Sequence, residues 1–429
     1  MDRHVDALIV GAGLAGLRCA TDLVDAGLDV VVLEARDRVG GRVWSHRFSD
    51  GQVCERGAEF IDGGHAGVLD LVAELGLTLT TRHGTIDAGG ADVDAGGRSV
   101  PMRLHASLAG DLARWEEAVN ALRVDAPDDA TLADLIRSVD LSVLGRLVVG
   151  RELRTEFMLP PEEVSQRFAA RVMSLRPFEQ REAHRVVGGN DQLAQGLAER
   201  LGDRVRLACP VAGIDADRGR CELADGSAIE AGVVVAAVPL PVLSRLWPSM
   251  PASLGRVGYG IGGKISVQFR RRLWLDYGRN GEVLSDRQWG HLWETTDDQP
   301  GDAGVLTNLL SSHDGAALAA MPQAPDQLVR EIDRLFPGAM GLAGERVHTD
   351  WTNDPYSLGA YVCCAPGQWE AAQTDLHRPH GRLWLAGEHA DDHTGFMEGA
   401  LRSGRRVAAA IIGSRDHPTT PPFGQSRTT

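Results

Sequence analysis

The sequence contains no run of apolar residues long enough to cross a membrane, and its six cysteines follow neither a C-x-x-C nor a metal-ligand spacing. A strand-like apolar segment begins a few residues after Met1, which leaves no room for a signal peptide. We therefore expect a cytoplasmic protein without a metal site. The thiols are expected to be reduced and mostly buried; they belong to Cys19, Cys54, Cys209, Cys221, Cys363 and Cys364.

Positive charge is scarce relative to negative charge. The chain has 44 Lys and Arg against 59 Asp and Glu, a formal net charge of −15. This balance disfavours nucleic acids and anionic membranes as partners and suits a soluble enzyme. It leaves open whether the acidity attracts cationic substrates or only maintains solubility. Internal repeats are absent, and 429 residues exceed the usual size of one core, so we expect two domains.

The beginning of the chain has the pattern of a dinucleotide-binding unit. An apolar run is followed by the loop Gly11-Ala12-Gly13-Leu14-Ala15-Gly16, a helical segment, a second apolar run and Glu34. The first glycine of this G-x-G-x-x-G loop permits a tight turn, the second lets the backbone approach a pyrophosphate, and the third packs helix on strand. The helix N-terminus favours phosphates, and Glu34 accepts hydrogen bonds from a ribose diol, which disfavours NADP.

The rest of the chain leaves this nucleotide unit twice and returns to it. Helical spacing from Thr80 to Arg185 predicts a mostly helical insertion, and the apolar run Val233 to Val238 predicts a return to a buried parallel strand. We predict an α/β protein with a Rossmann-like dinucleotide-binding domain and an interleaved α+β substrate domain. The predicted nucleotide domain comprises 1–80, 185–250 and 348–414, the substrate domain comprises 81–184 and 251–347, and 415–429 form a disordered tail.

With these segments in order, the chain resembles the flavin-containing amine oxidase family of monoamine, polyamine and L-amino-acid oxidases. The resemblance covers nearly the whole chain and implies FAD in a two-domain architecture like that of glutathione reductase. It extends the opening motif through Glu34, Ala35, Arg36, Gly40, Gly41 and Arg42. It further implies flavin contacts by Gly57, Ala58, Glu59 and Phe60, an adenine contact by the backbone of Val211, and a second FAD motif with Gly387, Glu388, Gly395, Phe396, Met397 and Ala400.

The resemblance also implies the catalytic residues. Lys264 matches the family lysine that holds a water against flavin N5, and we expect it to assist oxygen reduction. The residues alone leave open a strand-edge lysine that points to solvent. Tyr361 and Phe396 match two aromatic rings that face each other in front of the flavin, and Trp351 is expected to pack nearby.

Two departures from the family pattern refine this prediction. The position of the cysteine that bonds the flavin covalently in monoamine oxidases is Ala360, so we expect noncovalent FAD. Phe60 stands where some amino-acid oxidases have the arginine that clamps a substrate carboxylate, so an amino-acid substrate needs another arginine. Glu59, Asp62 and His65 either attract the far ammonium of a diamine or belong to a solvated turn.

The implied activity is an FAD-dependent oxidation of CH–NH2 or CH–NH groups. A hydride passes from the α-carbon of a neutral amine to flavin N5, the imine hydrolyses to an aldehyde or ketone, and oxygen is reduced to hydrogen peroxide. The alternatives are an L-amino-acid oxidase, including one for aromatic amino acids, a flavin desaturase, and an FAD-binding protein without activity. The expected partners are a small-molecule amine and oxygen, in a monomer or homodimer. The identity of the amine stays open.

Overall fold

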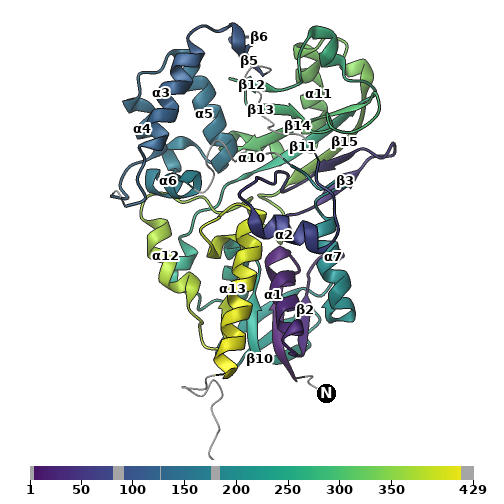
Figure 1. Cartoon of the computed structure of the whole chain (residues 1–429), viewed down its shortest axis with the longest axis vertical. Helices are drawn as coiled ribbons and strands as arrows, with labels where there is room; N and C mark the ends of the chain where they lie inside the picture. Colours follow the sequence, from purple (N-terminus) through teal and green to yellow (C-terminus); the bar gives the residue numbers. More distant parts are fainter. Residues whose placement is uncertain (1–3, 81–90, 126, 175–183, 417–429) are drawn as a thin grey trace, which may run out of the picture. The chain divides into compact units, whose positions relative to one another are not determined.

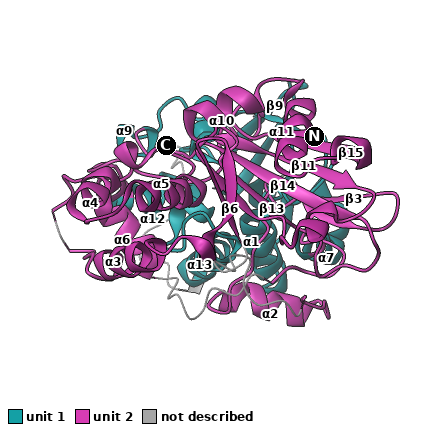
Figure 2. Ribbon diagram, turned by 90° about the horizontal axis from the view of Figure 1, so that it is seen from above, with its two compact units in different colours: residues 1–41, 193–255, 373–429 teal, residues 42–192, 256–372 magenta. Residues whose placement is uncertain are grey.

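The structure, a computed structural model, describes residues 4–80, 91–125, 127–174 and 184–416 (Figure 1). Its internal packing forms two compact units, which Figure 2 distinguishes by colour. We call Met1–Gly41, Leu193–Gly255 and Gln373–Thr429 the first unit. The second unit comprises Arg42–Gln192 and Arg256–Ala372.

The first unit is built on a seven-stranded sheet in which β1 lies between β2 and β10. The strand order is β7-β2-β1-β10-β9-β8, and β16 also pairs with β10. The pairs among β7, β2, β1, β10 and β16 are parallel, and those of β9 are antiparallel. The strands are β1 (His4–Val10), β2 (Val30–Leu33), β7 (Val205–Arg206), β8 (Val211–Asp215), β9 (Arg220–Leu223), β10 (Ala228–Ala236) and β16 (Leu383–Leu385). The nearly continuous apolar sequences of β1 and β2 are typical of strands buried on both faces.

Two helices from opposite ends of the chain lie side by side in the first unit (Figure 1). They are α1 (Leu14–Asp25) and α13 (Met397–Asp416). Their close approach depends on Gly404, because a Cβ at this position would lie 2.4 Å from the carbonyl oxygen of Ala15 and 3.2 Å from the amide nitrogen of Cys19. The packing of these helices brings the two ends of the sequence into one structural layer.

The second unit contains another seven-stranded sheet, in the order β15-β11-β14-β13-β12-β5-β6. All of its pairs are antiparallel except β12 with β5. Its strands are β5 (Asp92–Ala95), β6 (Arg98–Pro101), β11 (Gly262–Phe269), β12 (Val283–Ser285), β13 (His291–Glu294), β14 (Gly304–Ser311) and β15 (Ala343–Asp350). The helices α10 (Ser312–Ala319) and α11 (Ala324–Leu335) contribute Leu318, Leu328 and Ile332 to a core with Ile265 and Val267 of β11.

Side chains alternate between the two faces of this second sheet. Ile265 and Val267 belong to the apolar core, so Lys264 and Ser266 lie on the opposite face. The strand register aligns Lys264 with Leu309 and Ser266 with Thr307 on this face. The hydroxyl groups of Ser266 and Thr307 are hydrogen-bonded at 2.8 Å. The face opposite the apolar core therefore carries buried polar groups.

The remaining strands and helices connect these two sheets. The strands β3 (Ser45–Arg47) and β4 (Val53–Glu55) form a hairpin. The helices are α2 (Ala66–Glu74), α3 (Leu108–Asn120), α4 (Leu132–Ser138), α5 (Val143–Phe157), α6 (Gln166–Ser174), α7 (Gln192–Leu201), α8 (Leu240–Leu246), α9 (Ala252–Gly255) and α12 (Gln368–His377). Among the described residues no helix has the length and apolar character of a membrane span.

The predicted α/β class is confirmed, and the segment 80–185, which we predicted to be mostly helical, also contains short strands. This segment contains α3 to α6 but also β5 and β6. The strand β5 was not predicted because Asp92-Val93-Asp94 lacks the apolar run of a central strand. Its aspartates are nevertheless buried, because each is paired with an arginine that is distant in sequence. Residues 81–90, 126 and 175–183 of this segment lie outside the described residues.

The division into units differs from the predicted domain boundaries. Residues 42–80, 185–192 and 348–372 pack with the second unit, and 251–255 with the first. The side chain of Arg56 explains part of this difference, because it donates to the hydroxyl of Thr349 and the carbonyl of His348 on β15. Of the predicted tail, 415–416 continue α13, and 417–429 lie outside the described residues.

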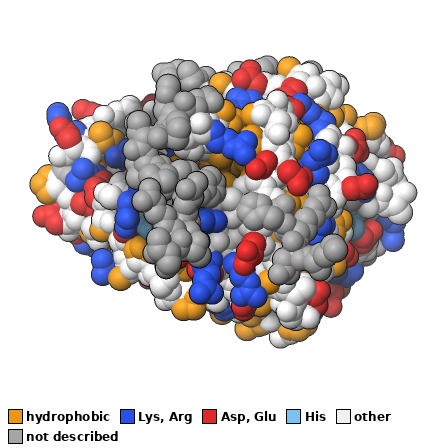
Figure 3. Space-filling model, turned by 90° about the horizontal axis from the view of Figure 1, so that it is seen from below, with side chains coloured by type: hydrophobic (Ala, Val, Ile, Leu, Met, Phe, Trp, Pro, Cys, Tyr) orange, Lys and Arg blue, Asp and Glu red, His pale blue; other side chains and the backbone are white. Residues whose placement is uncertain are grey.

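The thiols are mostly buried, as the sequence analysis predicts. All six cysteines are unbridged, and five of them are buried. On the face drawn in Figure 3, acidic and basic side chains lie interspersed among neutral ones.

Candidate active site

The glycine-rich loop in the first unit follows β1 directly and leads into α1. Gly11 has a φ of 103°, and a Cβ there would approach the carbonyl oxygen of Ala237 to 2.7 Å. A Cβ on Gly16 would lie 2.1 Å from the carbonyl oxygen of Gly11. A Cβ on Gly13 would meet no heavy atom within 4 Å. Thus Gly11 and Gly16 are needed by the fold, while the space beside Gly13 is open.

The carboxylate of Glu34 fixes this loop to the end of β2. Its two oxygens accept hydrogen bonds from the backbone amides of Ala12 at 2.8 Å and Arg36 at 3.0 Å. The amide of Gly40 donates to the carbonyl of Ala12 at 2.8 Å, which joins the predicted extension to the loop. The amide of Cys209 donates to the carbonyl of Glu34, so the segment that leads to Val211 also lies beside this site.

The second predicted motif also lies in the first unit. The carboxylate of Glu388 accepts a hydrogen bond from the amide of Gly395 at 2.9 Å, and the amide of Gly387 donates to the hydroxyl of Ser403 at 2.9 Å. These contacts fold the chain back just before α13 begins. The buried hydroxyl of Thr394 has no hydrogen-bond partner within the described residues.

These groups fit a dinucleotide such as FAD. The N-cap residue of α1, Gly13, has no side chain to cap the helix, so the amides of its first turn are oriented for phosphate oxygens. Each carboxylate oxygen has more than one lone pair, so Glu34 retains acceptor capacity for ribose hydroxyls. The hydroxyl of Thr394 offers a further polar contact. The other predicted cofactor residues of this unit lie in or beside these loops. Ala35, Gly41 and Phe396 belong to the loops, Ala15 lies in the first turn of α1, and Met397 and Ala400 lie in the first turn of α13.

The second unit places the predicted lysine in a buried contact with the predicted flavin loop. Lys264 on β11 is 5% exposed, and its Nζ donates to Oε2 of Glu59 at 2.6 Å and to the carbonyl oxygen of Gly57 at 3.1 Å. Its ammonium also lies 5.5 Å from the centre of the Trp293 ring. The alternative of a lysine that points to solvent is therefore wrong.

Glu59 receives further donors on its other oxygen. Arg185 donates to Oε1 through Nε at 3.1 Å and Nη2 at 2.9 Å, and Thr295 and Trp293 donate at 2.5 and 3.2 Å. Burial by itself raises the pKa of a carboxyl group, but the charges of Lys264 and Arg185, together with these hydrogen bonds, lower the pKa of Glu59 to about 2. Glu59 is therefore an anion at neutral pH.

Neighbouring segments hold the Gly57 loop in place. The amide of Ala58 donates to the carbonyl of Arg42 at 3.1 Å, and the side-chain amide of Asn190 donates to the carbonyl of Glu59 at 2.8 Å. The indole of Trp351 donates to the carbonyl of Arg56 at 3.0 Å and packs against Gly57, where a Cβ would lie 3.1 Å from the ring. Trp351 thus supports this loop from the side.

The predicted aromatic pair is divided between the units. The hydroxyl of Tyr361 donates to the carbonyl of Glu156 at 2.8 Å and lies 3.2 Å from that of Thr155, which satisfies carbonyls in the last turn of α5. Arg42 donates to the carbonyl of Ala360 at 2.6 Å, so Arg42 is tied to the residue before Tyr361. Phe396 belongs to the first unit, and its pairing with Tyr361 stays a prediction.

Asp62 and His65 do not form a solvated turn. Both are buried, the backbone amide of Asp62 donates to Nδ1 of His65 at 3.1 Å, and the imidazole lies 3.8 Å from the Asp62 carboxylate. Phe60 packs its ring 6.1 Å from that of Trp293, and the guanidinium of Arg185 lies 5.3 Å from the Phe60 ring. The predicted position of a carboxylate clamp is therefore apolar.

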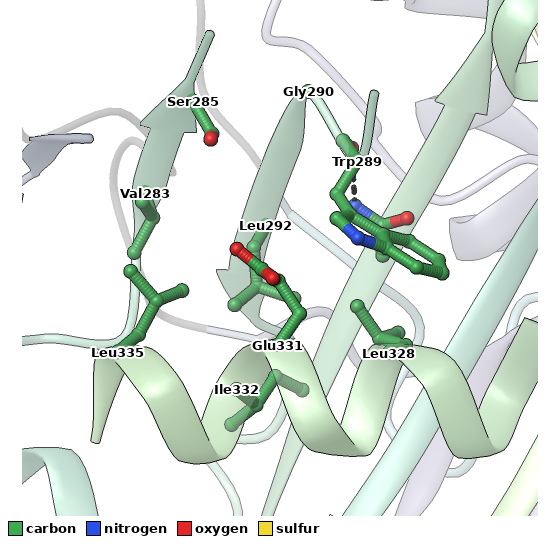
Figure 4. A pocket seen from close by; sticks show the side chains of 10 residues that line it. Val283, Ser285, Trp289, Gly290, Leu292, Leu328, Glu331, Ile332 and Leu335 are labelled. Atoms are coloured by element: carbon green, nitrogen blue, oxygen red, sulfur yellow. Dashed lines mark hydrogen bonds between the residues drawn. The ribbon is translucent and has the colours of Figure 1, made fainter. Parts of the chain in front are cut away.

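A small cavity lies on the other face of the second sheet and is separate from these residues (Figure 4). Its volume is about 10 Å³, which accommodates no more than one water. The side chains of Leu328, Glu331, Ile332 and Leu335 on α11 lie against those of the strands there. The cavity is too small for an amine substrate, and it lies on the face of the second sheet opposite the one that carries Lys264.

Three residues that contact Glu59 were not found from the sequence: Arg185, Trp293 and Thr295. One signal was present in the alternation of residues 291, 293 and 295, which places His291, Trp293 and Thr295 on the same side of an extended segment. Arg185 had no local signal, since only the folded chain brings it to Glu59.

Comparison with known proteins agrees with this geometry. The model of the flavin-containing amine oxidoreductase family matches residues 14–412. AofH of Mycobacterium tuberculosis, named as a candidate flavin-containing monoamine oxidase, is 28% identical over 95% of this chain and 96% of that protein. An L-amino acid dehydrogenase of Synechocystis is 26% identical over 95% of this chain and 95% of that protein.

Solved structures share the fold. Cyclohexylamine oxidase from Brevibacterium oxydans has a TM-score of 0.82 at 23% identity, and the match covers 97% of this chain and 100% of that one. The family match begins at the first residue of α1 and extends through the segment before α13 into that helix. The chain therefore belongs to the flavin-containing amine oxidoreductase family, with FAD as its cofactor.

Proposed function

We propose that the protein is an FAD-dependent amine oxidase in which Lys264 assists the reduction of oxygen. The observation that supports this role most strongly is the buried contact of Lys264 with Glu59 and the carbonyl of Gly57. A charged lysine is costly to bury, so its retention on an internal strand indicates a use for the charge. A fixed cation favours the negative charge that develops when oxygen is reduced.

The first unit supplies the proposed contacts to the adenosine and phosphate parts of FAD. When bound, FAD takes a hydride from the α-carbon of the amine and returns the electrons to oxygen. Glu34 would accept hydrogen bonds from the ribose, the backbone of Val211 would contact the adenine, and the N-terminus of α1 would bind the pyrophosphate. Glu388 holds the turn before α13, whose N-terminus favours negative charge on the reduced ring.

The chain has no suitable nucleophile for covalent attachment of the flavin at the expected position. The side chain of Ala360 has no reactive group. The next cysteine along the chain, after Tyr361 and Val362, is Cys363, which is buried. Burial raises the pKa of the Cys363 thiol well above its usual range, so the reactive thiolate is disfavoured. FAD is therefore held noncovalently.

Aromatic side chains orient the amine in this proposal. Tyr361 and Phe396 provide two ring faces, and Trp351 packs beside the Gly57 loop. The bond of the Tyr361 hydroxyl to the end of α5 fixes the ring direction, because the hydroxyl is already committed to backbone carbonyls. The ring faces rather than the hydroxyl therefore contact the substrate.

We propose amines without a carboxylate as the preferred substrates. Phe60 is apolar, and the charge of Arg185 is neutralised by Glu59. Neither side chain is arranged to clamp a carboxylate in the bidentate way that arginine provides. The second candidate function is oxidation of an L-amino acid, and the observation in its favour is the similarity to an L-amino acid dehydrogenase. This function requires a carboxylate-binding arginine from another part of the chain.

Peroxide release by the purified holoenzyme tests both candidates. The panel contains primary monoamines, diamines and L-amino acids, with paired compounds that differ only in the carboxylate, such as phenethylamine and phenylalanine. We expect peroxide with at least one amine and a higher kcat/KM for the amine of each pair. A preference for the amino acid of each pair contradicts the proposed substrate class but leaves the oxidase activity intact.

We also propose that the protein acts in the cytoplasm as a monomer or homodimer. The cytoplasmic location is supported by the six unbridged cysteines, because unbridged cysteines are typical of reducing compartments. Cell fractionation and light scattering after gel filtration measure the two properties. Recovery outside the cytoplasmic fraction, or a mass above that of a dimer, contradicts the respective proposal.

A further inference from the structure

Glu59 joins two buried cations, and this arrangement goes beyond the proposed contact of its backbone with the flavin. Glu59 and Arg185 are each 4% exposed, and Lys264 is 5% exposed. The three side chains come from the loop after β4, from the segment before α7 and from β11. An ion triad of this kind has a large desolvation cost, so it needs both close geometry and a compensating set of hydrogen bonds.

The two oxygens of Glu59 have separate partners. Arg185 approaches Oε1 through two nitrogens, and Thr295 adds a hydroxyl donor to the same oxygen. Lys264 approaches Oε2. The donors on Oε1 fix the plane of the carboxylate, and this plane sets the position of Oε2. The direction of the Lys264 ammonium is therefore set from the other end of the carboxylate.

Lys264 is the only lysine in the whole sequence; every other side chain of the Lys and Arg class is arginine. Arginine is a planar fork with five donors, whereas lysine is a compact point charge. A chain that uses arginine everywhere else but lysine here needs the compact ammonium at this position. This supports a role in which the exact placement of one charge matters.

We propose that Glu59 and Arg185 are positioning residues for Lys264. The Arg185–Glu59 pair fixes the ammonium beside the Gly57 carbonyl and places a negative charge against it. The inference rests on the proposed role of Lys264 in oxygen reduction. It adds that this role depends on the carboxylate of Glu59 and on Arg185. Arg185 is hydrogen-bonded to Glu59 and acts on Lys264 through that carboxylate.

Other ionisable groups surround the triad. Glu55 and Cys54 of β4 lie near enough to Glu59 and Lys264 to interact through their charges. Asp298 lies 3.7 Å from Nη1 of Arg185. Removal of the Glu59 charge leaves two buried cations, with Asp298 as the contact on the arginine side. Burial and mutual repulsion then both favour loss of the Lys264 proton.

Nitrogen-15 NMR tests this directly, because growth on 15Nζ-lysine labels a single site. The spectra are recorded on the FAD-free and the FAD-loaded protein between about pH 6 and 9, where an isolated exposed lysine stays charged. We expect one Nζ signal with the shift of an ammonium group over this range in both forms. In Glu59→Gln we expect the signal to move toward the neutral amine shift within the range.

Two further variants separate positioning from general destabilisation. Arg185→Met retains the Glu59 charge, so we expect a charged but broadened Nζ signal from a less fixed side chain. Glu59→Asp retains the charge and is expected to restore the ammonium shift at least in part. Glu345→Gln removes an exposed carboxylate that pairs with His46 and serves as the control, with no expected change of the Nζ signal.

Reoxidation of the reduced holoenzyme by oxygen provides the second readout. We expect Glu59→Gln to slow this step about tenfold and make its rate pH-dependent, with little change in flavin reduction by the amine. An unchanged Nζ signal in Glu59→Gln overturns the inference, whatever the rates are. Normal reoxidation in Lys264→Met overturns the proposed function of the lysine instead, so the two failures are distinguishable.

Discussion

The ammonium of Lys264 lies 2.6 Å from a carboxylate oxygen of Glu59, although the two residues are 205 positions apart in the sequence. Both side chains are buried on the face of the second sheet that lies opposite its apolar core. This contact connects the strand β11 to the loop that the family resemblance places beneath the flavin ring. Its consequences for catalysis and stability are accessible to experiment.

Replacement of Lys264 by methionine removes the charge but retains an apolar stem of similar length. We expect reoxidation of the reduced flavin by oxygen to slow about a hundredfold, because a positioned charge no longer stabilises the developing anion. Reduction of the flavin by the amine is expected to change much less. Stopped-flow absorbance, with the two half-reactions measured separately, checks this prediction. An unchanged reoxidation rate refutes the assigned role.

Substitution by alanine is expected to have different effects at Gly13 and at Gly16. A methyl group at Gly16 collides with the carbonyl of Gly11, so Gly16→Ala is expected to destabilise the FAD-free protein by more than about 1 kcal/mol. A methyl group at Gly13 meets no protein atom within 4 Å. Gly13→Ala is therefore expected to fold normally but to bind FAD at least about tenfold more weakly, because the methyl group occupies the approach to the pyrophosphate.

Urea unfolding of the FAD-free proteins and fluorescence titration with FAD measure the two effects. Wild-type FAD affinity in Gly13→Ala contradicts the proposed position of the pyrophosphate. Wild-type stability in Gly16→Ala contradicts the close packing of α1 on β1.

Tyr361 is expected to act through its ring. Tyr361→Phe removes the hydroxyl that donates to the carbonyl of Glu156, so we expect a loss of about 1 kcal/mol in unfolding free energy. Because the ring remains, kcat/KM is expected to stay within about threefold of the wild type. Tyr361→Leu serves as the comparison, and loss of the ring face is expected to lower kcat/KM further. Equal kinetic losses in both variants indicate that the hydroxyl contacts the substrate.

The raised pKa of the Glu55 carboxyl group is expected to make the free energy of unfolding depend on pH. Burial raises the pKa of Glu55 from 4.5 to about 7, although hydrogen bonds from Asn190 and Ser45 act in the opposite direction. Between these values the folded protein binds a proton that the unfolded chain has lost, so this group lowers stability as pH rises from 4.5 to about 7. The contribution is constant above this range.

Glu55→Gln removes this contribution and provides its measurement. The stability of the variant relative to the wild type is expected to increase by about 3 kcal/mol between pH 4.5 and 8. Glu59, whose pKa is lowered to about 2, contributes stability that is lost as pH falls below 4.5, and it does so in both proteins. Urea unfolding midpoints at several pH values give the difference. Parallel curves for the two proteins contradict the raised pKa.

The nucleotide loop was predictable because its parts lie within one strand-helix-strand unit. Glycine geometry at Gly11 and Gly16 follows from backbone sterics, and the acid at Glu34 follows from its place at the end of β2. The burial of Lys264 was left open, because a single lysine in an apolar strand is compatible with either a solvent-facing edge or a used charge. Its environment depends on which strands flank β11.

The partners of Glu59 were beyond sequence reasoning. The motif assigned its backbone to the flavin, while its side-chain role depends on Arg185, which is 126 positions away. Asp62 and His65 lie in a glycine-rich segment that is compatible with an exposed turn, yet both are buried and in contact with each other. In each case tertiary packing decides between two readings that local sequence permits equally.

Anaerobic mixing of the FAD-loaded protein with amines, followed by admission of oxygen, tests the central claim most directly. The account predicts that at least one amine bleaches the flavin absorbance and that oxygen restores it with formation of one hydrogen peroxide per flavin. Lys264→Met is expected to bleach but to recover slowly. Absence of bleaching with every amine of the panel contradicts the assignment of the protein as an amine oxidase.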